Sequence, residues 1–424
     1  MKNQFLAVLG LLCASFVFLS ACSFRQEQQL WKESYDELAV YRAELDSMRR
    51  EFRVFDMPDV SFFLFGMGNR EKFLYKDGKL MESFTGRVVK EWDVDEELII
   101  PSLYRVLLKT ADGKTVLLQE DEKGVWLHEG GKKSFPLVEQ QSRLVLPTFE
   151  KKRFSRILKV LHQEILINIV DGVPLPNYFV YKKGWRRDGA MMAICLEKTG
   201  NSELIKSWVL NFADPYDRNN AGEEEADNLG QTLFLLSLFA DKNHPAVART
   251  LEEIRRFERK NDQGKYIQGR SDFAEKPVYQ TKFLKWGLKK MGLPDDYIIP
   301  DVRDDYATLF WWDYKQSHRP GTVDADDHVK NDYYPYLGWA ADHFHGLKRN
   351  PVSNRDYPLT WEINASQANY EGMRIINSQY TVQRNATPHT WHAAEIFLYL
   401  LDGDMPGNCG TMEPSLQNRK QGTM

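Results

Sequence analysis

Residues 184–193 read Gly-Trp-Arg-Arg-Asp-Gly-Ala-Met-Met-Ala and lead into an apolar run. This pattern predicts that a buried helix begins at Asp188. A carboxylate is favoured at a helix start, because the free backbone N–H groups and the helix dipole attract negative charge. This helix-dipole effect explains Asp188 as an ordinary first-turn acid, but it does not explain why Trp185, Arg186 and Arg187 precede it. Four side chains able to stack on or hydrogen-bond a polyhydroxylated ligand indicate a pocket wall.

Residues 147–404 continue in the same way, with helix after helix. Apolar residues recur there at spacings of three and four, as in helices with one buried face. No strand of any length and no fixed-period repeat is predicted in this region. We expect helices at residues 154–170, 188–198, 202–212, 225–240, 245–259, 279–291, 304–315, 333–344, 360–376 and 390–401. So many helices, joined by polar loops, suggest antiparallel pairs arranged around an axis.

The preceding residues 57–146 consist of short β-rich runs separated by turn signals. The strongest of these signals are Asp77-Gly78 and Asp112-Gly113, since Asp-Gly favours tight hairpins. We expect a small antiparallel β domain of about seven strands. It is either a carbohydrate-binding module or, as is commoner, a packing domain for its neighbour.

The N-terminus has the layout of a secretory signal peptide over residues 1–21: Lys2, an apolar stretch, and then Leu19-Ser20-Ala21-Cys22. The last four residues resemble the lipobox of bacterial lipoproteins. This resemblance implies a bacterial envelope protein held by lipid at Cys22. Ser23 is similar to the residue that follows the cysteine in lipoproteins sorted to the outer membrane, on either face. The alternatives are an ordinary cleaved signal or a membrane anchor.

Residues 22–56 combine this anchor with a predicted amphipathic helix. Apolar side chains recur seven apart: Trp31, Leu38, Leu45 and Phe52. Such a helix serves as a brace on the body or as a stalk from the membrane, and a short coiled-coil dimer is an alternative. At the other end, residues 405–424 read as a tail.

Composition excludes several classes of function. The formal charge of −4 and the absence of a long Lys/Arg cluster argue against nucleic acid as a partner. After Cys13 and Cys22 are set aside, only Cys195 and Cys409 remain, so no disulfide framework is available, and Cys195 reads as a small buried hydrophobe. No cofactor is implied, and we expect a monomer.

A metal site is not predicted either. Three carboxylates, Asp324, Asp326 and Asp327, imitate a cation-binding loop but lack its remaining ligands. Two pairs of histidines lie on separate segments without a metalloprotease spacing: His343, His345, His389 and His392.

Two short motifs carry a family resemblance. Residues 185–190, Trp-Arg-Arg-Asp-Gly-Ala, resemble the Trp-x-Arg-Asp element of glucoamylase-like six-hairpin glycosidases. Residues 388–395, Pro-His-Thr-Trp-His-Ala-Ala-Glu, are similar to the Pro-His-x-Trp-x-x-Ala-Glu that opens the last helix in several relatives. The resemblance implies a mainly α fold, an (α/α)6 toroid of helical hairpins preceded by the β domain and the N-terminal helix. It also implies a glycan-degrading protein with its pocket at the loop end of the inner helices.

Hydrolysis of a glycosidic bond needs two carboxyl groups, one to protonate the leaving oxygen and one to activate water or attack. The candidates stand near helix starts, where each also reads as an ordinary first-turn acid or a salt-bridged structural residue: Glu225, Glu275, Glu362 and Glu395. The general-acid position of the glucoamylase-like loop corresponds to Glu275 by place alone. Candidates for binding sugar are Trp185, Arg187, Asp188, Asp227, Trp361, His389 and Trp391.

Two other functions remain open. A polysaccharide lyase would use Tyr333 or His343 as base and Arg187 to neutralise a uronate carboxyl. A catalytically silent lipoprotein would bind oligosaccharide or polysaccharide without turnover.

Overall fold

The computed structural model describes residues 2–52, 54–130, 135–139, 144–272, 274–302, 304, 352–362, 371–376, 378–383 and 388–403. It begins with a helix, continues with two antiparallel sheets and ends in helices separated by short hairpins. One connected cluster of buried apolar side chains runs through all three parts. The three parts therefore share a core.

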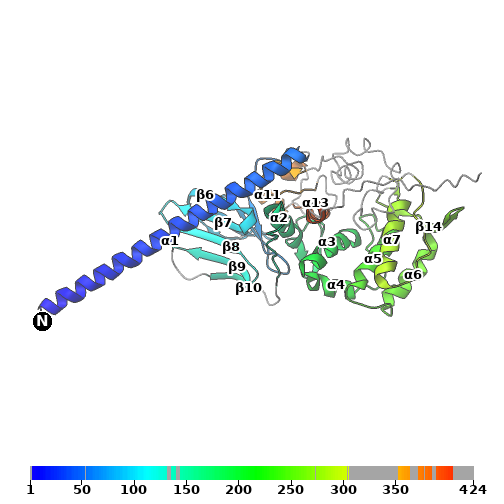
Figure 1. Ribbon diagram of the computed structural model, residues 1–424, viewed down its shortest axis with the longest axis horizontal. Helices are drawn as coiled ribbons and strands as arrows, with labels where there is room; N and C mark the ends of the chain where they lie inside the picture. The colour runs from blue at the N-terminus through cyan, green and yellow to red at the C-terminus, as the bar shows by residue number, and fades with distance from the viewer. Residues whose placement is uncertain are drawn as a thin grey trace, which may run out of the picture.

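Helix α1 spans Lys2–Glu51, and its N-terminal part extends away from the rest of the protein (Figure 1). The face that packs on the body carries buried residues at spacings of three and four: Leu38, Tyr41, Leu45 and Met48. Arg156 of the next helix forms ion pairs with Glu37 at 2.8 Å and with Glu44 at 2.9 Å. The expected amphipathic helix is thus confirmed, and it braces the body. In the described part of the chain, no helix combines the length and apolar character needed to cross a membrane.

The first sheet pairs four strands in chain order, β2 (Phe63–Phe65), β3 (Phe73–Lys76), β4 (Lys79–Glu82) and β5 (Val88–Glu91). The second has the order β10 (Phe135–Glu139), β9 (Gly124–Glu129), β8 (Thr115–Glu120), β7 (Arg105–Thr110) and β6 (Val94–Ile100), with the 3-10 turn η1 (Pro101–Leu103) between β6 and β7. Asp77 and Gly78 turn between β3 and β4 with φ of 48° and 74°, as a tight hairpin requires. The antiparallel β region is confirmed, with additional strands at β4, β6 and β10 that the sequence pattern did not predict.

Six longer helices follow: α2 (Ser155–Leu166), α3 (Arg186–Thr199), α5 (Asp227–Ser237), α6 (Pro245–Phe257), α7 (Pro277–Met291) and α13 (Thr390–Gly403). Shorter turns are η2 (Ser202–Ile205), α4 (Lys206–Leu210), α11 (Glu371–Ile376) and α12 (Ser378–Gln383). Helix α13 packs on α2 and α3, α3 on α5, and α5 on α7. The last pair is very close, because a Cβ at Gly230 of α5 would lie 2.3 Å from the backbone of Phe283.

The expected (α/α)6 toroid is wrong. The protein mixes helices with several antiparallel sheets, and the described residues form seven helices of seven or more residues, too few for six helical hairpins. Two further expected helices, at residues 304–315 and 333–344, lie almost entirely outside the described residues.

Strands also occur where none was expected. Three small hairpins pair β11 (Ile169–Val170) with β12 (Val173–Pro174), β13 (Glu258–Asn261) with β14 (Gly264–Ile267), and β15 (Arg270–Ser271) with β16 (Ala274–Glu275). A fourth pair, β1 (Val54–Phe55) with β17 (Val352–Ser353), joins the end of α1 to the C-terminal part. The sequence pattern did not predict these strands, because two to four residues are too few to show the two-residue period of a strand among helical spacings.

Candidate functional site

The start of α3 places four side chains of the motif in different surroundings. Trp185 is the N-cap residue, with extended backbone at φ −104° and ψ 143°, and Arg186, Arg187 and Asp188 follow in the buried first turn. The turn is tightly packed, because a Cβ at Gly189 would lie 2.6 Å from the ring of Trp208. The predicted helix start is confirmed, two residues earlier than expected.

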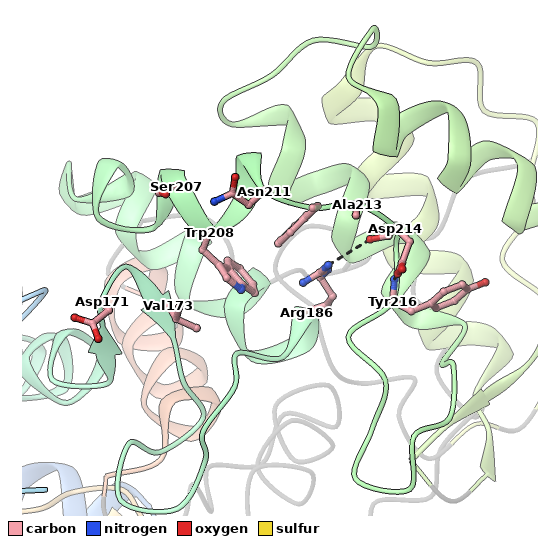
Figure 2. Close-up of a pocket in the computed structure, with 10 residues that line it drawn as sticks. Asp171, Val173, Arg186, Ser207, Trp208, Asn211, Ala213, Asp214 and Tyr216 are labelled. Atoms are coloured by element: carbon pink, nitrogen blue, oxygen red, sulfur yellow. Dashed lines mark hydrogen bonds between the residues drawn. The ribbon is translucent and has the colours of Figure 1, made fainter.

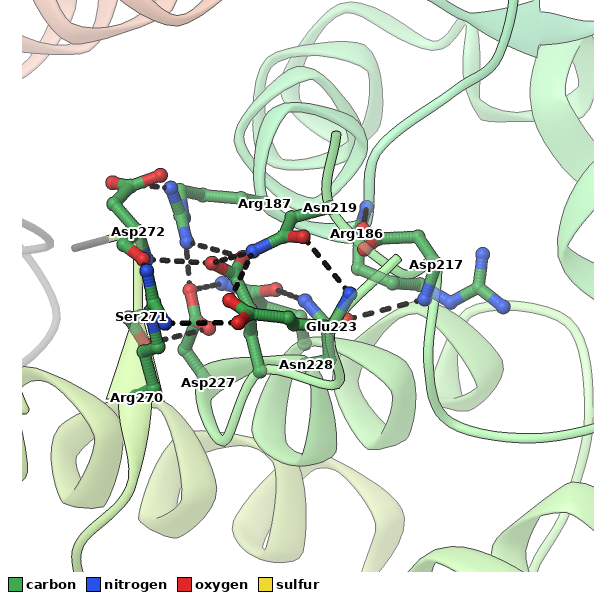
Figure 3. A network of polar contacts seen from close by, with 12 residues as sticks. Arg186, Arg187, Asp217, Asn219, Glu223, Asp227, Asn228, Arg270, Ser271 and Asp272 are labelled. Atoms are coloured by element: carbon green, nitrogen blue, oxygen red, sulfur yellow. Dashed lines mark hydrogen bonds and ion pairs between the residues drawn. The ribbon is translucent and has the colours of Figure 1, made fainter. Parts of the chain in front are cut away.

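Arg187 points into a group of carboxylates from the loops before α5 and α7 (Figure 3). Its guanidinium forms ion pairs with Glu225 at 2.9 Å, with Asp227 at 2.8 Å and with Asp272 at 2.7 Å. Burial lowers the pKa of Arg187, but the three carboxylates outweigh it and hold the pKa well above its ordinary value. Arg187 therefore ties the start of α3 to two other segments.

Asp227 is fully occupied within this group. Besides Arg187, it accepts hydrogen bonds from Oγ of Ser271 at 2.7 Å and from Nε2 of Gln231 at 2.8 Å. Glu225 accepts the backbone N–H of Asp272 at 2.6 Å, and burial together with its acidic neighbours raises the pKa of Glu225 to about 7. Arg187, Asp227 and Glu225 thus satisfy one another, which favours a positioning role over direct contact with sugar.

Asp188 lies within electrostatic range of a second carboxyl group, that of Glu362. Burial raises the pKa of Asp188 to about 7, against the lowering effect of Arg187 and with help from Asp217. Burial also raises the pKa of Glu362 to about 8, and the charge of Asp188 contributes to that rise. Because neither site solvates two negative charges, one of these carboxyls keeps its proton near neutral pH.

Side chains from separate segments surround Glu362. The hydroxyl of Tyr181 donates a hydrogen bond to Oε1 of Glu362, and the ring of Tyr181 meets that of Trp185 edge-on, with centroids 5.3 Å apart. On the other side, Nε2 of His389 lies 4.0 Å from Oε2. The two sequence motifs, at the starts of α3 and α13, therefore converge on this glutamate.

Glu164 of α2 holds the backbone of the segment that carries Glu362. This buried carboxyl accepts the backbone N–H groups of Leu359 at 2.5 Å and Thr360 at 3.1 Å, and also the hydroxyl of Thr360. Burial raises the pKa of Glu164 to about 8. Glu164 is thus a positioning residue: it holds Leu359 and Thr360, and Thr360 lies two residues before Glu362.

Two buried polar atoms at this site lack a hydrogen-bond partner among the described residues. They are Nε1 of Trp185 and Oε2 of Glu362. A buried donor or acceptor without a hydrogen bond costs about 1–3 kcal/mol of folding free energy. Such atoms are therefore usually hydrogen-bonded, to protein, water or ligand. A donor and an acceptor side by side with two aromatic rings are the groups that a sugar hydroxyl and a sugar face require.

The structure does not bring the other four sequence candidates to this site as reacting or binding groups. Glu275 is exposed on β16 and accepts a hydrogen bond from Gln268. Trp361 is buried and stacks on Phe55 at 4.6 Å, so it is part of the core instead of a sugar platform. Trp391 is likewise buried, at 2% exposure. Glu275 is therefore a surface residue, and Trp361 and Trp391 are core residues.

Glu395 is buried on α13, where the sequence left a choice between a catalytic base and a structural ion pair. Arg187 is not the partner in such an ion pair, because it pairs with Glu225, Asp227 and Asp272. Instead the charge of Glu395 acts on Lys282 of α7, a buried lysine whose pKa burial lowers to about 7. The structure therefore favours the structural reading for Glu395.

Tyr181, Asp272 and Glu164 are the residues that sequence reasoning missed. Asp272 was visible in the acidic loop before α7, and Tyr181 in an aromatic run just ahead of Trp185. Glu164 gave no signal, because a glutamate on an amphipathic helix normally faces water.

Several expectations lie beyond the described residues. They include the carboxylates Asp324, Asp326 and Asp327, the lyase candidates Tyr333 and His343, Cys409, and the tail at residues 405–424. Cys22 lies within α1, but its side chain is also outside the described part, so lipidation stays a prediction. Cys195 is buried in the core, as predicted, with its Sγ 4.0 Å from the backbone oxygen of Ala394.

Comparison with known proteins identifies no family for this chain. Among the residues that the structure describes, no group of three or more His, Cys, Asp or Glu side chains is placed to hold a metal ion. The site is thus defined by its own geometry, centred on Asp188, Glu362, Tyr181, Trp185 and His389. No family model, no curated protein and no solved structure matches the chain.

Proposed function

We propose that this protein is a glycoside hydrolase whose reacting groups are Asp188 and Glu362. The observation that carries the proposal is the pair itself: two largely buried carboxyls within electrostatic range of each other, with pKa values raised to about 7 and about 8. Acetal hydrolysis near neutral pH needs one carboxyl that still holds its proton and one that has lost it.

The higher pKa favours Glu362 as the proton donor. Its carboxylic acid transfers a proton to the glycosidic oxygen while the bond from that oxygen to the anomeric carbon breaks. Asp188, as a carboxylate, accepts a proton from water, whose oxygen forms the new bond to the anomeric carbon. Glu362 loses one proton to the leaving oxygen, and Asp188 gains one proton from water. Exchange of protons with solvent restores both carboxyls, so no further reactant is needed.

The surrounding groups support this assignment. Trp185 and Tyr181 supply aromatic surface for a sugar ring, and the indole N–H of Trp185 supplies a donor without a partner among the described residues. His389 is neutral near pH 7, since burial lowers its pKa to about 3, so it does not form an ion pair with Glu362. A neutral neighbour leaves the proton of Glu362 in place.

The test is a screen of the full-length protein against plant, host and bacterial glycans, with release of reducing ends as the readout. Glu362→Gln and Asp188→Asn are expected to lower release by about a hundredfold or more, the usual contribution of a general acid or base. Glu275→Gln is the matched control, because this exposed glutamate lies outside the proposed pair, and it is expected to retain activity.

Other outcomes decide between the alternatives. Equal activity of parent and Glu362→Gln would overturn the assignment. Unsaturated products that absorb ultraviolet light would identify a lyase, and tight binding of a glycan without turnover would identify a silent binding protein.

A further inference from the structure

A pocket of about 420 Å³ opens beside the start of α3, between α4 and the loop that follows it (Figure 2). Its volume falls within the range of about 300–1,000 Å³ that is usual for small-molecule sites. The residues that line it include Arg186, Ser207, Trp208, Asn211, Phe212 and Asp214. None of the residues that form the Asp188–Glu362 site lines this pocket, so it is a separate feature.

Arg186 is the buried cation of this pocket, at 7% exposure. Its guanidinium lies 3.4 Å from the ring centroid of Phe212, and its Nε donates to Oγ1 of Thr232 at 3.2 Å. One terminal nitrogen, Nη2, donates to the backbone oxygen of Asp214 at 3.3 Å. These contacts fix the orientation of the guanidinium without using all of its five donors.

Arg186 differs from its neighbour Arg187 in its charge partners. Arg187 forms three ion pairs, whereas the described part of the chain places no carboxylate within ion-pair distance of Arg186. Buried arginines are normally paired, because an isolated buried charge is costly. An anionic ligand in the pocket would therefore neutralise a buried charge.

The nearby acids are committed elsewhere. Asp214 accepts the backbone N–H of Tyr216 at 2.9 Å and pairs with Arg218 at 3.3 Å. Asp217 accepts the backbone N–H of Arg186 itself. Asp171 is exposed at the edge of the pocket. These carboxylates act on the guanidinium only at longer range and leave its terminal donors for a ligand.

We propose that this Arg186 pocket binds a sugar that carries a carboxylate, a uronic acid residue. The guanidinium provides the planar fork that matches a carboxylate. Trp208 provides an apolar wall, held in place because its ring edge packs against Gly184 and Gly189. The exposed side chains of Ser207 and Asn211 provide hydroxyl and amide groups for sugar hydroxyls. The site does not depend on the proposed hydrolysis, and binding is measurable without turnover.

The test is calorimetric titration of the full-length protein with glucuronate and galacturonate, each beside its methyl ester. Saturable one-to-one binding of an acid is expected, with its uncharged ester bound at least tenfold more weakly, because the charge-assisted pair to Arg186 is lost. Acetate is the second comparison, since it carries the carboxylate without the ring, and it too is expected to bind at least tenfold more weakly.

Two variants test whether the uronate binds in this pocket. Arg186→Lys keeps the charge but loses the fork, and at least a tenfold loss is expected. Ser207→Trp fills the pocket from an exposed position and leaves Arg186 itself unchanged, so it tests the site even if Arg186→Lys fails to fold. Binding must be lost in Ser207→Trp while its melting temperature matches the parent.

Three results would overturn the proposal. They are the absence of uronate binding, equal binding of acid and ester, and full binding by a folded Ser207→Trp. Acetate bound as tightly as the uronates would show an anion site without specificity for sugar.

Discussion

Nε2 of His389 lies 4.0 Å from Oε2 of Glu362, and the imidazole is kept neutral because burial lowers its pKa to about 3. The contact thus joins a neutral ring to a carboxyl whose own pKa is raised to about 8. A glutamate that faces no fixed positive charge on this side keeps its proton in the folded protein at neutral pH. Three consequences of this site and its supports, and one of the packing of α1, are open to measurement.

The raised carboxyl pKa values predict that stability falls between about pH 4.5 and pH 8. The pKa of Glu362 rises from an ordinary 4.5 to about 8, so the folded protein holds more protons than the unfolded chain in this window. Its contribution to stability is fully present below the unfolded pKa and is lost as the pH rises through the folded one, at up to about 1.4 kcal/mol per pH unit. Urea unfolding at pH 5 and pH 8 measures the loss. Glu362→Gln does not titrate, so its loss is expected to be smaller, and an identical pH dependence would refute the raised pKa.

Trp185→Phe is expected to affect binding and stability in opposite directions. The change removes an indole N–H that has no partner among the described residues, so the folded protein loses no hydrogen bond and gains up to about 1 kcal/mol. A substrate that uses this N–H loses a hydrogen bond, and we expect KM to rise about fivefold to tenfold with little change in kcat. Thermal melting and steady-state kinetics on the glycan found in the screen provide the two readouts. A destabilised variant with unchanged KM would mean that the ring is structural.

Arg187→Met is expected to cost about 3–5 kcal/mol of folding free energy, because it leaves Glu225, Asp227 and Asp272 buried together without their shared cation. Arg218→Met is the control, since its pairs with Asp214 and Glu224 lie near the surface and such pairs contribute about 1 kcal/mol or less. Denaturant unfolding of the two variants compares them directly. Equal costs would show that the buried cluster does not depend on Arg187.

Leu45→Ala in α1 is expected to cost about 2–5 kcal/mol, as for other buried leucines. Val40→Ala on the same helix is the control, because Val40 is 44% exposed and its truncation changes stability by about 0.5 kcal/mol or less. Unfolding measured by circular dichroism tests both. If the two variants were equally stable, α1 would be a stalk with no bracing role.

Local structure was largely predictable from the sequence. The amphipathic periods predicted α1 and most later helices, and the Asp-Gly pairs predicted the hairpins of the β region, because these patterns act over a few residues. Pairing of the short strands β11–β16 was not predictable, since two to four residues carry no period. The count and closure of the helices, on which the toroid expectation rested, likewise depended on contacts that no local pattern encodes.

The candidate site divides in the same way. The sequence alone determined that Asp188 stands near the start of a buried helix, and it offered Trp185, Arg187, His389 and Glu362 as candidate polar or aromatic groups. Residues 360–362 do not form the start of the helix that was expected there. Only the tertiary structure decided that Glu362 comes within electrostatic range of Asp188 while Glu275 stays exposed. It also decided that Arg187 pairs with three carboxylates, while Arg186 forms no ion pair with a described residue. The physical reason is that pKa shifts and ion pairs depend on distance and burial, which arise between segments far apart in the chain.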